Sequence, residues 1–212
     1  MTSQFARLAF CSLALCASGA MAQTDLGVPP FTGTYTVEYR GIRAGTIDFI
    51  LRAEADHYVY EMRTHPRGLA KMVVNDNVRE ASEFTVENGA IKPRYYELED
   101  GSKSTDDDTR LKFDWPARRA SGTHENKPIE IALADGVQDR MSAQVVVMQY
   151  LLAGKQFDKL AFIDRDALKE YSYQKIKEEK LKTALGELDT IVYASSRPGS
   201  NRVSRLWYAP SL

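Results

Sequence analysis

The 212-residue chain has 28 Lys and Arg residues against 29 Asp and Glu residues, a formal net charge of −1, and 43% hydrophobic residues. This balance is typical of one folded globular protein and excludes the disordered and fibrous classes. A near-neutral chain gives no global electrostatic reason to bind nucleic acid or an anionic membrane surface, because both require a basic excess. No nucleic-acid partner is therefore expected.

The first 22 residues have the pattern of a secretory signal peptide. Arg7 supplies a positive charge, an uncharged apolar stretch follows over residues 8–19, and Ala20, Met21 and Ala22 form a small-x-small cleavage site. The apolar stretch is shorter than the roughly 20 residues of a transmembrane helix, so a retained membrane anchor is the weaker alternative. We predict a cleaved signal peptide over residues 1–22, a single domain over residues 23–212 and a periplasmic location, with no stable membrane span.

Both cysteines of the chain, Cys11 and Cys16, lie in the predicted signal peptide. The mature chain would therefore have no thiol for a disulfide, a thiolate zinc site or a cysteine nucleophile. Neither cysteine follows a small residue, so lipid attachment is not expected. The mature chain is nevertheless long enough to bury a hydrophobic core without cross-links.

Residues 34–115 show the period-two alternation of half-buried β-strands. Strands are predicted at Thr34–Tyr39 and Thr46–Ala53, joined by a turn over Gly41–Gly45. The next strand begins at Tyr58 and is expected to stop where residues 65–68 (His-Pro-Arg-Gly) interrupt the ladder. Two or three further strands are expected between residues 73 and 101, with Asn88 and Gly89 as a tight turn, and another at Arg110–Trp115.

One segment departs from this alternation. Apolar residues recur at helical spacing over Met141–Ala153, with Asp139 or Ser142 as the N-cap and Gly154 as the end of the helix. The β-branched run Val145–Val147 favours a helix only weakly, so packing against a sheet must stabilise it.

Strand patterns return after the helix, at residues 160–164, 168–178, 187–194 and 202–208. The order of strands, one helix and more strands predicts a mainly β fold. We expect a curved antiparallel sheet, or half-barrel, wrapped around one helix.

Residues with catalytic or metal-binding chemistry are scattered rather than clustered. His57, His65 and His124 fall in different predicted segments, and no metal-ligand spacing, nucleophile elbow, phosphate-binding loop or dinucleotide motif is present. The run Asp106–Asp108 offers oxygen ligands for Ca²⁺, although a solvated turn is the simpler interpretation. No catalytic residue, metal or cofactor is therefore expected.

Several aromatic side chains share one face of the predicted sheet, and Tyr35 lies on that face. Such a face can enclose an apolar or lipid-like ligand in a half-barrel, although an aromatic stripe is more often ordinary core. The candidate cavity residues are Tyr39, Phe49, Tyr58, Tyr60, Phe113 and Trp115 on the strands and Met148 on the helix.

Short motifs follow one another in order along the mature chain. They are Tyr35-x-Val37-x-Tyr39-x-Gly41-Ile42-x-Ala44-Gly45, Pro93-x-x-Tyr96, Phe113-Asp114-Trp115, Asp139-x-x-Ser142, Thr183-x-x-Gly186 and Trp207-x-Ala209-Pro210. With this set the chain resembles the periplasmic family catalogued as domain of unknown function 3108 (DUF3108).

The resemblance implies an envelope protein of Gram-negative bacteria with an all-β, lipoprotein-carrier-like curved sheet, and it carries over no catalytic residues. Members of that family usually continue after the Trp-x-Ala-Pro motif with another strand pair. The chain is therefore either a fragment or lacks those strands. In the second case the strand near Tyr208 would be an unpaired edge, open to a partner strand.

Two functions from different classes fit these observations. The first is a binding or carrier protein for an apolar or amphipathic envelope molecule, with the sheet as the wall and the helix as a plug or lid. The second, only narrowly behind, is a non-enzymatic structural or interaction protein that docks on an envelope partner through a sheet edge. The mid-chain helix and the mixed charges of Lys169–Lys182 disfavour an outer-membrane barrel. An enzyme using carboxylates such as Glu61 or Asp114 ranks last, and no enzymatic activity is expected.

Overall fold

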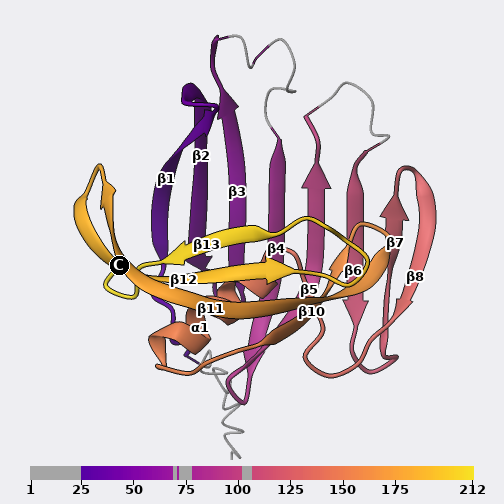
Figure 1. Ribbon diagram of the computed structural model, residues 1–212. Coiled ribbons are helices and arrows are strands. Elements are labelled where there is room, and N and C mark those ends of the chain that lie inside the picture. Colours follow the sequence, from indigo (N-terminus) through magenta and orange to yellow (C-terminus); the bar gives the residue numbers. More distant parts are fainter. Residues whose placement is uncertain (1–24, 69–70, 72–77, 102–106) are drawn as a thin grey trace, which may run out of the picture.

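The structure, a computed structural model, describes residues 25–68, 71, 78–101 and 107–212. These residues form two β-sheets and one short helix, so the predicted mainly β fold with a large antiparallel sheet is confirmed (Figure 1). The first sheet is an antiparallel meander of eight strands in chain order and does not close into a barrel. Its strands are β1 (Phe31–Tyr39), β2 (Ile42–Ala53), β3 (Tyr58–Pro66), β4 (Arg79–Glu87), β5 (Ala90–Glu99), β6 (Thr109–Asp114), β7 (Arg119–His124) and β8 (Lys127–Ala132).

The second sheet has five strands in the order β13-β12-β11-β10-β9. Its strands run across those of the first sheet, as Figure 1 shows, and the helix contacts both sheets. All its pairings are antiparallel except that of β9 with β10. The elements are β9 (Gln138–Asp139), α1 (Ser142–Leu152), β10 (Lys159–Asp164), β11 (Ala167–Thr183), β12 (Gly186–Ser196) and β13 (Ser204–Tyr208). The predicted signal peptide, residues 1–22, lies outside the described residues.

The turn between β1 and β2 is shorter than predicted. It consists of Arg40 and Gly41 alone, with φ of 52° and 76°, which is the left-handed geometry of a tight hairpin. The expected turn over Gly41–Gly45 was therefore wrong, because β2 already begins at Ile42. Gly45 lies inside β2, where a Cβ atom would come within 2.4 Å of the His65 carbonyl oxygen. This glycine permits a close approach of two strands rather than a turn.

Strand β3 does not stop at His65. His65 pairs with Thr46 and Pro66 pairs with Gly45, so the strand continues two residues into the predicted interruption and ends within it, at Pro66. Pairing between β3 and β4 ends at Arg63, and Pro66 therefore lies where its missing N–H removes no bond to β4.

Strands β7 and β8 were not predicted from the sequence. β7 buries only Ala120 completely and carries Gly122, so it lacks the large alternating apolar side chains that mark a strand. By contrast, the predicted Asn88-Gly89 turn is confirmed, with φ of 52° and 79° at the two residues.

The predicted end of the helix at Gly154 is confirmed, whereas its N-cap position is Met141, which makes no side-chain cap hydrogen bond, rather than Asp139 or Ser142. Those two residues nevertheless hold the turn that precedes the helix. The Asp139 carboxylate accepts hydrogen bonds from the backbone N–H groups of Met141 and Ser142, each at 2.8 Å. The Ser142 hydroxyl accepts in return from the Asp139 N–H at 3.0 Å. At the other end Gly154 has φ of 65°, and its N–H and that of the next residue donate to carbonyls of the last turn. Among the described residues, no helix has the length and apolar character needed to cross a membrane.

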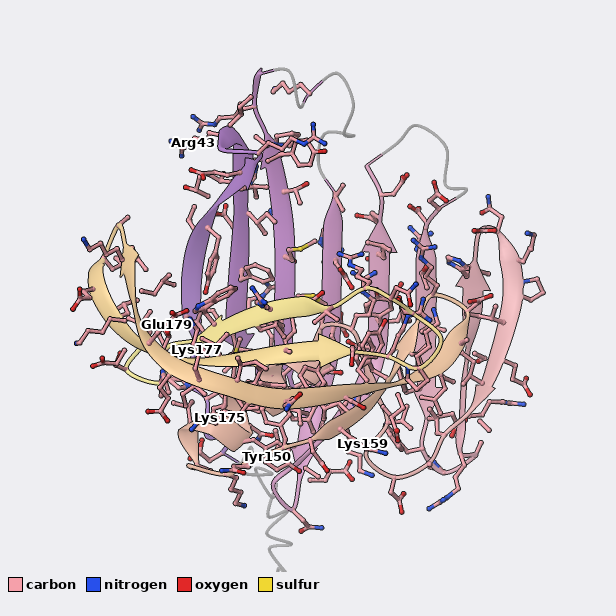
Figure 2. The ribbon with its side chains drawn as sticks, in the orientation of Figure 1. Arg43, Tyr150, Lys159, Lys175, Lys177 and Glu179 are labelled. Carbon is pink, nitrogen blue, oxygen red and sulfur yellow. The ribbon has the colours of Figure 1, made fainter. Side chains whose placement is uncertain are left out.

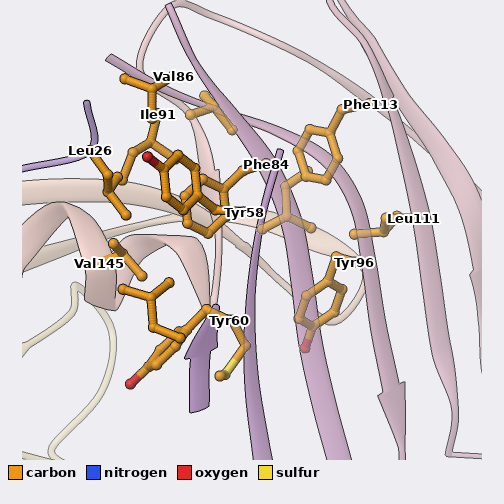
Figure 3. Packing of buried hydrophobic residues seen from close by; sticks show 14 of the residues in the cluster. Leu26, Tyr58, Tyr60, Phe84, Val86, Ile91, Tyr96, Leu111, Phe113 and Val145 are labelled. Carbon is orange, nitrogen blue, oxygen red and sulfur yellow. The ribbon is translucent and has the colours of Figure 1, made fainter. Parts of the chain in front are cut away.

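The main hydrophobic core lies between the first sheet and the helix (Figure 3). Phe84 and Val145 are completely buried there, and Tyr58 stacks on Phe84 with ring centroids 5.8 Å apart. Tyr96 is also buried, and its hydroxyl donates to Glu80 at 2.7 Å. A smaller cluster joins the helix to the second sheet and consists of Val147, Phe157, Leu160 and Tyr193.

Candidate functional site

A cleft of about 770 Å³ lies between the two sheets, and we call it the inter-sheet cleft. Its lining comes from β1, β2 and β3 of the first sheet, from α1, and from β10 to β13 with the turns that join them. A cleft of this size is within the range of ligand sites, roughly 300 to 1,000 Å³. It is therefore the candidate functional site.

One side of the inter-sheet cleft is apolar and largely aromatic. Phe49 stacks on Tyr60 with ring centroids 5.9 Å apart, and Tyr35 meets Phe49 edge-on at 5.5 Å at the exposed rim. Burial, with smaller contributions from Tyr35 and Tyr208, raises the pKa of Tyr60 well above its usual value, so its phenol stays neutral. We call this surface, formed by Tyr35, Phe49, Tyr60, Met148 and Tyr208, the apolar wall.

A second side of the inter-sheet cleft is polar. Asp164 accepts hydrogen bonds from the Lys169 ammonium and the Tyr171 hydroxyl, each at 3.1 Å. Burial acts to raise the pKa of Asp164, but the hydrogen bond and positive charge of Lys169 hold it below its usual value. Arg140, next to the buried Asp139, has its Nε atom 3.2 Å from the Glu80 carboxylate.

Three further arginines line the inter-sheet cleft, namely Arg165, Arg197 and Arg202. Arg165 lies in the turn between β10 and β11, and the other two lie in the segment between β12 and β13. We call these three residues the arginine mouth. Their side chains are exposed, which leaves them accessible to a ligand.

Three of the seven candidate residues from the sequence line the inter-sheet cleft, namely Phe49, Tyr60 and Met148. They come from β2, β3 and α1, so the fold brings Phe49 and Met148, which are about 100 residues apart in the chain, to the same cleft.

The other four candidates lie outside the inter-sheet cleft. Tyr58 and Phe113 are buried in the main core. Trp115 packs beside that core and its indole N–H donates to the Pro93 carbonyl at 2.7 Å. Tyr39, near the tip of the β1–β2 hairpin, is 66% exposed.

Several residues that line the inter-sheet cleft were not among the candidates predicted from the sequence. Leu206 and Tyr208 belong to a strand that the alternation did predict, but nothing in the pattern says which sheet that strand joins or what it faces. The arginine mouth gave no signal either, because its members lie in turns and are separated in the sequence by up to 37 positions.

The histidines are not brought together. The His57 ring contacts Asp56, the His65 ring contacts Asp48 and the His124 ring contacts Thr109. Within the described part of the chain, no group of three or more His, Cys, Asp and Glu side chains is arranged to hold a metal ion.

The carboxylates considered as calcium ligands or catalytic groups also lie outside the inter-sheet cleft. Asp106 is outside the described residues, and Asp108 accepts a hydrogen bond from the Asp100 backbone N–H at 3.1 Å. Glu61 is buried on the opposite face of the first sheet, where it pairs with arginines such as Arg79 at 3.1 Å. The Asp114 carboxylate accepts a hydrogen bond from the Ala117 backbone N–H in the following turn.

A family model described as a protein of unknown function, DUF3108, matches residues 34–212. The chain belongs to the DUF3108 family. The matched region of this DUF3108 protein includes both sheets, the helix and every residue that lines the inter-sheet cleft. Comparison with curated proteins and with solved structures gives no match. The geometry of the cleft must therefore carry the functional argument.

Proposed function

We propose that this DUF3108 protein is a periplasmic binding or carrier protein that holds an apolar or amphipathic envelope molecule in the inter-sheet cleft. The observation that carries the proposal is the cleft itself, about 770 Å³ between two sheets with an apolar wall on one side. Removing apolar ligand surface from water contributes roughly 25 cal/mol per Å², so an aromatic wall of this kind favours an apolar ligand. The predicted signal peptide supports the periplasmic location.

The helix forms a fixed side of the proposed binding site. Val147 and Met148 face the inter-sheet cleft, while Val145 on the same helix and Met141 directly before it are completely buried in the main core. Moving the helix as a lid would expose those core residues to water, at a cost of several kcal/mol. We therefore assign α1 as a wall, with ligand entry through the open side of the cleft.

Binding rather than catalysis fits the polar groups of the inter-sheet cleft. Asp164, the one carboxylate in its lining, is already hydrogen-bonded by Lys169 and Tyr171. Both hydrogen bonds fall on its Oδ2 atom, and its Oδ1 atom lies 3.9 Å from Arg140, so this carboxylate serves as the partner of two cations. A general base or nucleophile would instead have a carboxylate directed at substrate.

The alternative function is docking of a partner protein through a sheet edge. The observation that favours it is β13, which pairs only with β12 among the described strands and presents a half-exposed Trp207. The two functions differ in whether the inter-sheet cleft is occupied, so a direct measurement of occupancy distinguishes them.

The test is native mass spectrometry of the protein purified gently from periplasm, with organic extraction, together with fluorescence titration of the neutral probe N-phenyl-1-naphthylamine. We expect a co-purifying apolar molecule and saturable probe binding by the wild type. Met148→Glu places a charge in the apolar wall and should weaken probe binding by about tenfold or more. Leu152→Glu, on the same helix but exposed and outside the cleft, is the matched control and should bind as the wild type does.

Leu206→Glu places the same charge in the cleft from β13 of the second sheet instead of from the helix, in case Met148→Glu disturbs folding. Circular dichroism checks that each variant is folded. A wild type with no extractable molecule and no saturable probe binding would contradict the carrier function and favour docking through β13.

A further inference from the structure

The lining of the inter-sheet cleft is strongly unbalanced in charge. Five basic residues and one carboxylate contribute to it, although the whole chain has a formal charge of −1. Positive charge is therefore concentrated at this one place against the composition of the protein. The basic residues are Arg140, Arg165, Lys169, Arg197 and Arg202.

Two of these five cations already have protein partners. Lys169 is bound by Asp164, and Arg140 is paired with Glu80 and lies 3.9 Å from Asp164. In contrast, none of the three guanidinium groups of the arginine mouth forms an ion pair or a side-chain hydrogen bond within the described residues. The Arg202 backbone N–H donates to the Ser200 hydroxyl at 3.2 Å, and the charge of Arg197 acts on Tyr171. The three guanidinium groups are therefore available to an external anion.

Several basic residues elsewhere on the second sheet have acidic partners, although Lys182 and Arg205 form no ion pair within the described residues. Figure 2 labels Lys159, Lys175 and Lys177 along β10 and β11, outside the inter-sheet cleft, and each pairs with a glutamate. Glutamates neutralise those lysines on the protein surface, whereas no acid does so for the arginine mouth. The partners are Glu170, Glu178 and Glu179 respectively.

The strand order brings the arginine mouth to one end of the second sheet. β10 to β13 form an antiparallel meander, so the β10–β11 turn and the β12–β13 loop lie at the same end. The β11–β12 hairpin lies at the opposite end, on the left of Figure 1. Arg165 in the first connection and Arg197 and Arg202 in the second therefore lie toward the same end of the sheet and line the same cleft, although they are remote in sequence. β12 ends opposite Ser172, so the β12–β13 loop begins about five residues of β11 away from the β10–β11 turn.

The apolar wall lies toward the other end of β13. The cleft lining along this strand changes from Arg202 and Ser204 to Leu206 and Tyr208. Ser204 and Tyr208 are about 13 Å apart along an extended strand. Tyr208 lies close enough to Tyr60 for its charge to contribute to the raised pKa of that phenol. The cleft therefore has a cationic end and an apolar end.

We propose that the ligand is an anionic amphiphile, with a carboxylate or phosphate head bound by the arginine mouth and an apolar tail against the apolar wall. The inference rests on the proposed function, since it assigns a chemical class to the molecule in the same cleft. Guanidinium groups match carboxylate and phosphate oxygens with paired hydrogen bonds, which makes arginine the residue suited to such heads. A neutral ligand would leave these three charges without a partner.

The experiment compares decanoate with decanol, which have tails of the same length, by displacement of N-phenyl-1-naphthylamine at pH 7.5. The wild type should bind decanoate about tenfold or more tightly than decanol, because charge-assisted hydrogen bonds add to the burial of the tail. The variant Arg165→Gln/Arg197→Gln/Arg202→Gln should lose that preference and still bind decanol and the neutral probe.

The control variant is Arg43→Gln/Arg67→Gln/Arg205→Gln. It makes the same change in net charge at arginines outside the inter-sheet cleft, of which Figure 2 labels Arg43. It should keep the full preference for decanoate. Loss of the preference in this control as well would assign the effect to overall charge and overturn the proposed role of the arginine mouth.

The remaining outcomes distinguish failure of the anionic head from failure of the carrier function. Equal binding of decanoate and decanol by the wild type would overturn the anionic head and leave the carrier function standing. If acetate at the same concentration displaced decanoate, the site would bind small anions without using the apolar tail. That result would overturn the proposal of an amphiphilic ligand. If the wild type bound neither the neutral probe nor decanoate nor decanol, the proposed function itself would be overturned.

Discussion

Tyr58 and Tyr60 lie two residues apart on β3, point to the same face of the first sheet, and have different surroundings. Both belong to the main core: Tyr58, 8% exposed, stacks on Phe84, whereas Tyr60, 1% exposed, stacks on Phe49 and also borders the inter-sheet cleft. Alternation along a strand decides only which face a side chain occupies. The neighbours that cover that face decide whether a buried residue is surrounded by core alone, as Tyr58 is, or also borders the cleft, as Tyr60 does.

Two aspartates show the same contrast between the sealed core and the inter-sheet cleft. Asp139 is completely buried beside the core, and burial raises its pKa to about 6 against the hydrogen bonds that favour its charged form. Asp164 lines the cleft, where Lys169 keeps its pKa below the usual value. The sealed region therefore disfavours charge, while the cleft holds a stable ion pair.

The largest expected effect comes from breaking the sealed region. Phe84 is completely buried, so Phe84→Ala leaves an enclosed void that its rigid neighbours cannot fill. We expect the free energy of unfolding to fall by about 3 to 5 kcal/mol, measured by urea denaturation. A loss below about 1 kcal/mol would show that this part of the sheet is not packed core.

The next effect is a change in the pH dependence of stability. The raised pKa of Asp139 means that the folded state holds a proton that the unfolded state has released between pH 4 and about pH 6. Stability from this group is fully present below its ordinary pKa of 3.8 and is lost as the pH rises through 6. In Asp139→Asn the side-chain oxygen can still accept the hydrogen bonds from the backbone N–H groups of Met141 and Ser142. Relative to this variant, the wild type should lose up to about 3 kcal/mol between pH 4 and pH 7.

Asp164→Asn is the control for that profile and has the opposite sign. Because the folded pKa of Asp164 is lowered, its contribution is present above 3.8 and is lost as the pH falls below that value. The variant should therefore flatten the acid side of the stability profile and leave the region from pH 5 to pH 7 unchanged. Parallel profiles of the wild type and Asp139→Asn from pH 4 to pH 7 would contradict the assignment of Asp139.

The parts of the fold that followed from the sequence depend on local chemistry. Asn88 and Gly89 specify a hairpin turn by themselves, Asp139 and Ser142 hold the turn that precedes the helix, and Gly154 ends it. Each of these signals involves residues close together in the chain. The mainly β fold, the helix and most strand positions could therefore be predicted.

The parts that did not follow depend on packing between distant segments. Gly45 resembles a turn residue until the close approach of His65 shows why no side chain fits there. The arginine mouth exists only because two connections of a meander lie toward the same end of the second sheet and line one cleft. The near-neutral net charge of the chain gave no sign of this local positive charge, since acidic residues elsewhere balance the arginines in the total.

The smallest expected effect on stability comes from the apolar wall. Phe49 is half-buried, and the space vacated in Phe49→Ala is continuous with the open cleft, so no enclosed void forms. The loss in the free energy of unfolding should stay near 1 kcal/mol, mainly from lost ring contacts, while affinity for N-phenyl-1-naphthylamine falls by about fivefold to tenfold. Tyr39→Ala, at an exposed aromatic outside the cleft, should change stability by less than about 0.5 kcal/mol and leave probe binding intact. If Phe49→Ala were as destabilising as Phe84→Ala, the apolar wall would be packed core, and the difference between the two tyrosines of β3 would disappear.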